Sequence, residues 1–197
     1  LVPILSLPLI LNKLGWKKIV RFYSTTGGVF LILFLPFFSF KFLENYSATI
    51  GLWFSNFEFN ASIYYFLKWV LVEVKGLNII NNMGAVVATF VTIQTIFQLL
   101  HKKKETKALL LMIFWVLCGY YFISTTIHPW YITSLLMLSV FTKYKFITLW
   151  SYTIIFSYFA YGELEIKESG FWLSLEYIPV IVMLVWELYS RKKLKHH

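Results

Sequence analysis

Clusters of basic residues alternate with long apolar runs in this chain, and this alternation leaves few folds open to it. Fourteen of its eighteen Lys and Arg residues fall in four clusters, which are Lys13/Lys17/Lys18/Arg21, Lys102/Lys103/Lys104/Lys107, Lys143/Lys145 and Arg191/Lys192/Lys193/Lys195. Acidic or neutral stretches fill every second gap, at 41–80, 124–130 and 162–176. Cytoplasmic loops of membrane proteins carry such an excess of Lys and Arg. The pattern predicts a multi-pass protein of the inner (plasma) membrane with its carboxyl terminus in the cytoplasm.

Composition agrees with this prediction and argues against a soluble nucleic-acid-binding protein. The chain is 59% hydrophobic and only 14% charged, whereas a soluble domain is about half apolar and a quarter charged. The net charge is +9, but the basic residues flank apolar runs and form no stripe on a water-facing helix. We therefore expect the lipid bilayer, and no nucleic acid, as the partner of these charges.

Six apolar runs approach the roughly 20 residues that a spanning helix needs, and they cover residues 20–40, 79–100, 108–125, 130–142, 146–161 and 174–189. Residues 1–12 are shorter, contain two prolines and are expected to end a further span. We therefore expect an all-α polytopic transmembrane helix bundle with about six full spans and a partial N-terminal one. It would form a single transmembrane domain over residues 1–197. Because the chain opens on Leu1 inside an apolar run, we expect it to be the C-terminal portion of a longer protein.

The long loop over residues 41–80 has internal order. From Ile63 onward its apolar residues recur every three or four positions as far as Val74, which predicts an amphipathic helix lying in the membrane interface. Asn60 precedes this helix and can accept hydrogen bonds from its first amides as an N-cap.

The candidate functional residues fall on the loops expected outside the membrane. His128 is titratable and lies near membrane depth, so it is a candidate ligand for a phosphate at the bilayer surface. An alternative needs no function: Pro129 would begin the next helix, and Trp130 and Tyr131 would belong to an aromatic belt. The residues alone leave both interpretations open.

Glu58 is the second candidate, because it lies between two phenylalanines. A carboxylate among aromatic rings would have its charged form disfavoured and is suited to act as a base or metal ligand. An ion pair with Lys68 or simple solvation is an equal alternative. Asn60 and Tyr64 are candidates for binding sugar hydroxyls. The nine acidic residues are all Glu, and none is expected in the middle of a span.

Three segments together resemble bacterial polyprenyl-phosphate-dependent mannosyltransferases of the GT-C superfamily. They are FEFNASIYYFLKW (57–69), STTIHPWYITSLLMLSVFT (124–142) and WSYTIIFSYFAYGE (150–163). The resemblance implies an integral membrane enzyme that transfers a hexose, most simply mannose, from a polyprenyl-phosphate donor to an acceptor glycan or lipid on the outer face. Such enzymes invert the donor bond and use a carboxylate base in an outer loop near the first span.

Under this resemblance, His128, Trp130 and Tyr131 would flank the donor phosphate or its polyprenyl chain, and Asn60 and Tyr64 would line the sugar or acceptor side. The catalytic carboxylate would lie upstream of Leu1, with Glu58 as a weak candidate within the chain, so the chain alone would be inactive. No metal ligand set is implied, and a need for a divalent cation stays open. A small-molecule-binding subunit of a membrane transporter and an assembly subunit without a ligand are the alternatives.

Overall fold

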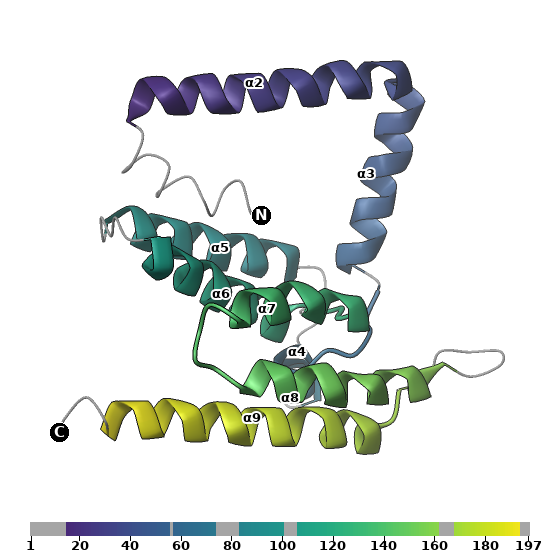
Figure 1. Ribbon diagram of the computed structural model, residues 1–197. Helices are drawn as coiled ribbons and strands as arrows, with labels where there is room; N and C mark the ends of the chain where they lie inside the picture. Colours follow the sequence, from purple (N-terminus) through teal and green to yellow (C-terminus); the bar gives the residue numbers. More distant parts are fainter. Residues whose placement is uncertain (1–14, 56, 74–82, 101–105, 162–167, 194–197) are drawn as a thin grey trace. The chain divides into compact units, whose positions relative to one another are not determined.

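The computed structural model describes residues 15–55, 57–73, 83–100, 106–161 and 168–193, and most of these residues are helical, with no strand among them (Figure 1). The all-α prediction is therefore confirmed for the described ranges. Eight α-helices are present there: α2 (Trp16–Phe34), α3 (Phe40–Ser55), α4 (Ile63–Lys68), α5 (Met83–Leu100), α6 (Thr106–Ile123), α7 (Ile132–Ser139), α8 (Phe146–Thr153) and α9 (Gly170–Lys193). Short 3₁₀ turns follow α2 and α8 and precede α7, and a π-helical turn, Trp69–Glu73, follows α4.

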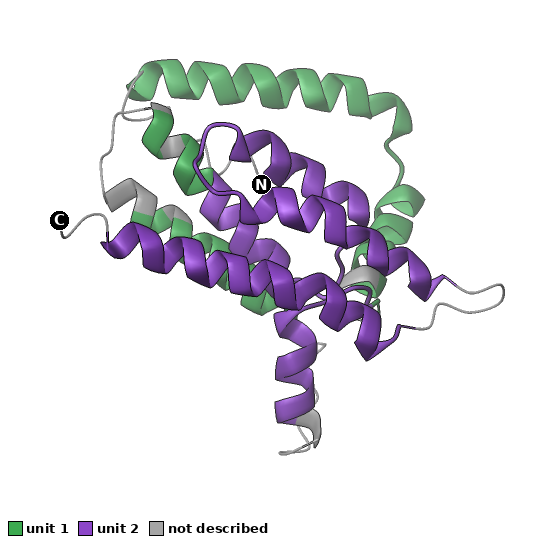
Figure 2. Cartoon of the chain, turned by 60° about the horizontal axis from the view of Figure 1, so that its bottom comes forward, with its two compact units in different colours: residues 1–57, 80–113 green, residues 58–79, 114–197 purple. Residues whose placement is uncertain are grey.

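The chain forms two compact units, which Figure 2 shows in different colours. Unit 1 contains residues 1–57 and 80–113, and unit 2 contains residues 58–79 and 114–197. The boundary crosses α6, whose last turns belong to unit 2. Whether the two units act as one transmembrane domain stays a prediction.

Two helical segments are long and apolar enough to cross a membrane. They are Trp16–Phe37, which joins α2 to its 3₁₀ turn, and Gly170–Lys193, which is α9. The other expected spans are shorter in the described residues; the eight residues of α7 rise only about 12 Å against a hydrocarbon core of about 30 Å. The two long helices give weak support to membrane association, and the six-span bundle stays a prediction.

In unit 1 the stretch expected to open the long polar loop is instead a 16-residue helix, α3. Pro36 lies in the 3₁₀ turn after α2, where a missing amide hydrogen and a fixed φ favour a break in the α-helix. Ser39 then begins the next helix, because its hydroxyl accepts the Phe42 amide hydrogen at 3.0 Å in the manner of an N-cap. Figure 1 shows α2 and α3 meeting at a corner here. The expected first span at 20–40 therefore ends earlier than predicted.

Unit 2 is organised around α8 and α9, which lie side by side in Figures 1 and 2 and pack against each other. Phe146, Ile147 and Trp150 lie on one face of α8 and are fully buried. Tyr177 and Val180 are buried residues of α9 at helical spacing. Such alternation of buried and exposed positions at a period near 3.6 residues is the reason these segments pack as helices.

Two predicted helix boundaries are wrong. The helix after Asn60 begins at Ile63, with Ser62 at its N-cap position, so Asn60 is not the N-cap. Its α-helical part ends at Lys68, and residues after 73 lie outside the described part of the chain. The last helix begins at Gly170, one turn before the expected 174, so Glu176 lies further inside the helix than the predicted span placed it. Glu176 is fully buried, so an acidic residue does lie within this apolar helix.

Candidate functional site

The segments 58–60 and 125–128, far apart in the sequence, run side by side in unit 2. Phe59 and Thr126 form an isolated parallel β-bridge. The Phe59 amide donates to the Thr125 carbonyl at 3.0 Å, and the Ile127 amide donates to the Phe59 carbonyl at 2.8 Å. Backbone groups of extended segments pair in this way when neither can find a partner within a helix. The bridge brings two of the predicted site segments together.

His128 lies inside an aromatic cluster beside this bridge. Its ring stacks on Trp130 with centroids 4.4 Å apart and planes 7° apart, and Phe59 lies 5.2 Å away on a tilt of 29°. Tyr131 meets the imidazole edge-on at 5.4 Å. His128 is 7% exposed, while Trp130 is 57% exposed. Burial lowers the pKa of His128 from its ordinary value of 6.5, because removal from water disfavours the charged form. A neutral imidazole is therefore expected at neutral pH.

Asn60 is the most constrained residue of the site. It is fully buried and adopts a left-handed backbone with φ of 50°, a conformation that Asn tolerates better than most residues. Its carbonyl accepts the Tyr177 hydroxyl at 2.7 Å, its amide hydrogen goes to Glu168, and its Nδ2 donates to Glu176 Oε1 at 3.1 Å. The predicted cap is thus replaced by contacts with α9 and the residues before it.

Glu58 forms an ion pair with Lys68, as one of the two alternatives predicted. The Lys68 Nζ lies 2.8 Å from Oε1 and 2.6 Å from Oε2 of the carboxylate. The hydroxyl of Tyr64, which is fully buried, also donates to Glu58 at 2.8 Å. Burial and the bond to Glu58 raise the pKa of Tyr64, since both disfavour a phenolate. Tyr64 therefore acts first as a support for Glu58.

A second carboxylate, that of Glu168, contacts Asn60. It accepts the backbone amide of Asn60 and the hydroxyl of Tyr65. Burial raises the pKa of Glu168, opposed by these hydrogen bonds, and burial together with the bond to Glu168 raises the pKa of Tyr65. Sequence reasoning did not select Glu168, because it lies among other loop glutamates with no motif around it.

Sequence reasoning also missed Glu176 and Trp150. The indole Nε1 of Trp150 donates to Glu176 Oε1 at 2.9 Å, and both side chains are fully buried. A signal was present: the predicted span 174–189 already contained Glu176, and Phe171, Trp172 and Leu173 extend the apolar run toward the N-terminus, which moves Glu176 away from the helix end. Ionisable residues within apolar helices mark functional sites by default.

The residues around the bridge are better suited to an organic ligand than to a metal ion. The described residues contain no group of three or more His, Cys or Glu side chains placed to hold a metal ion. Cys118 is a buried free thiol in α6. Around the bridge, an exposed indole, a neutral imidazole and a paired carboxylate provide hydrogen-bonding groups next to apolar surface, which is the usual make-up of a site for an organic ligand.

Comparison of this chain with protein-family models, with curated proteins and with solved structures found no match in any of the three.

The lowered pKa of His128 predicts a pH dependence of stability. In the unfolded chain this histidine takes up a proton near its ordinary pKa of 6.5, whereas the folded chain takes it up only at lower pH. The contribution of His128 to the stability of the folded state is therefore expected to decrease as the pH falls from about 7.5 to 5.5. Glu168 acts in the opposite sense at lower pH, because its raised pKa favours the folded state on acidification.

The thermal midpoint of the wild-type chain should fall more over this pH range than that of His128→Gln, when both are measured by circular dichroism in the same detergent. The other histidines are common to both proteins and cancel. Parallel curves would contradict a depressed pKa at His128.

Proposed function

We propose that this chain is part of an integral membrane glycosyltransferase that transfers a hexose from a polyprenyl-phosphate donor to an acceptor glycan or lipid. One observation carries the proposal: the two most specific segments of the GT-C resemblance, FEFN and HPWY, lie beside each other, because Phe59 bridges Thr126, two residues before His128, and its ring lies 5.2 Å from that of His128. The resemblance rests on residues in the printed sequence, and the bridge is independent of it. Segments that build one ligand site have to meet in space, and these do.

The geometry supports a distribution of roles. Neutral His128 would donate a hydrogen bond to the donor phosphate, since hydrogen bonds to charged groups are the stronger kind. Trp130, with its exposed indole stacked on that imidazole, would contact the polyprenyl chain. Tyr131 would border the same region. Tyr64 donates to Glu58, which pairs with Lys68; this group would line the sugar or acceptor side, and the base that removes the acceptor proton would come from another carboxylate.

The test is replacement of His128 in the complete gene product. His128→Ala should lower turnover about 10- to 100-fold, which corresponds to the loss of about 1.5–3 kcal/mol for a hydrogen bond to a charged group. His128→Asn, which keeps a donor, should retain part of the activity. Transfer is measured in membranes from polyprenyl-phosphate [¹⁴C]mannose to endogenous acceptor, with protein amounts matched by immunoblot.

His101→Ala is the control of the same residue type, at a position expected in a cytoplasmic loop. Equal turnover of His128→Ala and wild type would leave TTIHPWY as the start of a helix. The proposed role of His128 in sugar transfer would then be wrong, and a small-molecule-binding subunit of a transporter would describe the chain better.

The sidedness that this proposal needs predicts the outcome of cysteine labelling. A cysteine at Ser169, whose side chain is exposed, should react with an impermeant maleimide added to intact cells, and one at Thr106 should react only after lysis. The native Cys118 is 1% exposed and should stay unlabelled in both. The reverse pattern would place the candidate site on the cytoplasmic side.

A further inference from the structure

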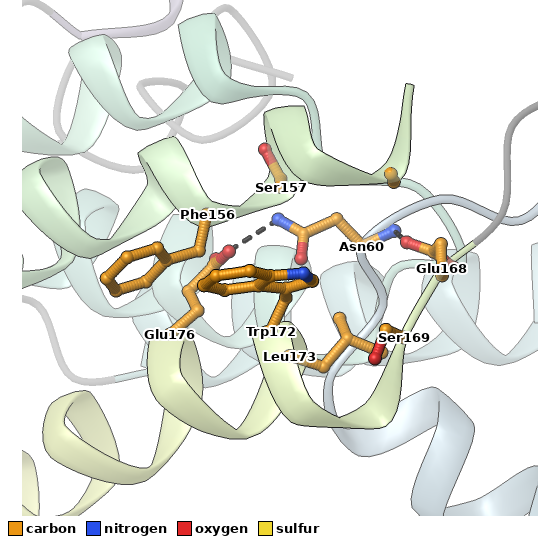
Figure 3. A pocket seen from close by; sticks show the side chains of 9 residues that line it. Asn60, Phe156, Ser157, Glu168, Ser169, Trp172, Leu173 and Glu176 are labelled. Atoms are coloured by element: carbon orange, nitrogen blue, oxygen red, sulfur yellow. Dashed lines mark hydrogen bonds between the residues drawn. The ribbon is translucent and has the colours of Figure 1, made fainter. Parts of the chain in front are cut away.

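A small cavity lies beside Asn60, and Figure 3 shows the side chains around it. Nine described residues line it: Asn60, Phe156, Ser157, Ala160, Glu168, Ser169, Trp172, Leu173 and Glu176. The hollow is partly open, and its enclosed part is only about as large as a water molecule needs. It therefore accepts one group of the size of a water molecule.

Two of the residues that line this cavity have a side-chain oxygen with no hydrogen-bond partner among the described residues: Asn60 Oδ1 and Glu176 Oε2. Both residues are fully buried. Their other polar atoms are used, because Asn60 Nδ2 and Trp150 Nε1 both donate to Glu176 Oε1. A buried acceptor without a donor costs about 1–3 kcal/mol, and most buried polar groups in proteins are satisfied. The cavity is thus suited to a ligand that donates hydrogen bonds.

The charge around the cavity also favours a ligand that donates hydrogen bonds. Two of the nine lining residues are glutamates, and none of them is a Lys, Arg or His. Lys68, the basic residue nearest in the chain to Asn60, pairs with Glu58. Buried carboxylates are costly unless they are paired with a positive group. The burial that raises the pKa of Glu168 expresses the same cost. A positively charged donor would satisfy both the charge and the free acceptors.

Aromatic rings complete the lining. The indole of Trp172 stacks on Phe159 with centroids 4.2 Å apart, and on Phe156 at 5.8 Å. Aromatic faces attract cations, with Trp the strongest. A metal ion fits less well, because Ca²⁺ takes six to eight oxygen ligands and Mg²⁺ keeps several waters, whereas this cavity has room for one water-sized group. A primary ammonium is compact and carries three donors.

We propose that the cavity formed by Asn60, Glu168, Glu176 and Trp172 binds a primary ammonium group, R–NH₃⁺. Two of its N–H groups would donate to Asn60 Oδ1 and Glu176 Oε2, and the third would face the Glu168 side of the cavity. The substituent R would leave through the open side. The group can come from the ethanolamine headgroup of a phospholipid or from a soluble amine. The inference does not depend on the proposed transferase activity.

The test measures binding of radiolabelled ethanolamine to the full chain in phosphatidylcholine nanodiscs at pH 7, with unlabelled choline as competitor. Choline has no N–H group and a bulkier head, so it should compete at least tenfold more weakly than unlabelled ethanolamine. Glu176→Gln should weaken ethanolamine binding about tenfold or more, because the new amide presents donors where the ligand needs an acceptor. Glu44→Gln, on the exposed surface of α3, should bind like wild type.

Asn60→Gly is the second variant, and it removes the amide while glycine keeps the left-handed backbone without strain. It should weaken binding to a similar degree, and thermal midpoints close to wild type will show that the variants are folded. Saturable binding with this pattern supports the proposal. No saturable binding, equal competition by choline, or competition by Mg²⁺ or Ca²⁺ in place of amines would each overturn it, as would a folded Glu176→Gln that binds normally.

Two further arms separate the sources of the ammonium. If a lipid supplies it, nanodiscs that contain phosphatidylethanolamine should suppress binding of labelled ethanolamine, and nanodiscs of phosphatidylcholine should not. If a soluble amine supplies it, putrescine should compete while phosphatidylethanolamine has no effect. Either result supports an ammonium site and assigns its origin.

Discussion

Replacing Trp150 with alanine is expected to lower the free energy of unfolding by about 3–5 kcal/mol, the usual cost of removing a large buried aromatic side chain. Trp150 is fully buried. Its ring stacks on Phe122 with centroids 4.7 Å apart and meets Tyr177 at 5.7 Å. The variant loses these contacts and the indole hydrogen bond to Glu176 together, so its effect should lie near the upper end of this range.

The measurement is urea-induced unfolding in detergent, followed by far-ultraviolet circular dichroism. Trp186→Ala is the matched control on α9, because it removes the same side chain from a position that is 62% exposed. It should cost less than about 1 kcal/mol. Trp150→Phe separates the two contributions, since it keeps most of the ring volume and loses the hydrogen bond. Similar midpoints for Trp150→Ala and Trp186→Ala would mean that Trp150 is not part of the core of unit 2.

Replacing Glu187 with alanine is expected to cost about 2–3 kcal/mol, because the start of α8 would lose its acceptor. Glu187 lies on α9 and is 5% exposed. Its Oε1 accepts the Lys145 amide at 2.8 Å and its Oε2 accepts the Phe146 amide at 3.3 Å. Lys145 provides no side-chain cap of its own. Glu187 therefore caps α8 from another helix, and its charge suits the positive end of the helix dipole.

Glu187→Gln should lie between alanine and wild type in the same unfolding experiment, because one carbonyl acceptor remains. Glu44→Ala on α3 is the control for loss of an exposed glutamate, and it should change the free energy of unfolding by less than about 0.5 kcal/mol. If Glu187→Ala unfolds like Glu44→Ala, the ends of α8 and α9 are joined mainly by Arg191, which donates to the Lys143 carbonyl and stacks over Tyr144 at 4.1 Å.

Local pattern was sufficient for the helical class and for part of the candidate site. The apolar runs predicted helices near α2, α5, α6 and α9, and the described residues are helical there. The pairing of Glu58 with Lys68 was one of two predicted alternatives, the other being a solvated carboxylate. The boundaries were less predictable: Ser39 begins a helix within what looked like a continuous span. A single serine after a proline is a weak signal in an apolar run.

The sequence by itself determined that the chain is helical, that its composition is largely apolar, and that FEFN and HPWY are its most distinctive segments. Only the tertiary structure decided that Phe59 pairs with Thr126, that Asn60 bonds Glu176 instead of capping a helix, and that Glu187 caps α8. The physical reason is the range of the interactions. Hydropathy and helical periodicity depend on neighbours within a few turns, whereas a buried carboxylate obtains its donors from segments that meet it only after the helices have packed.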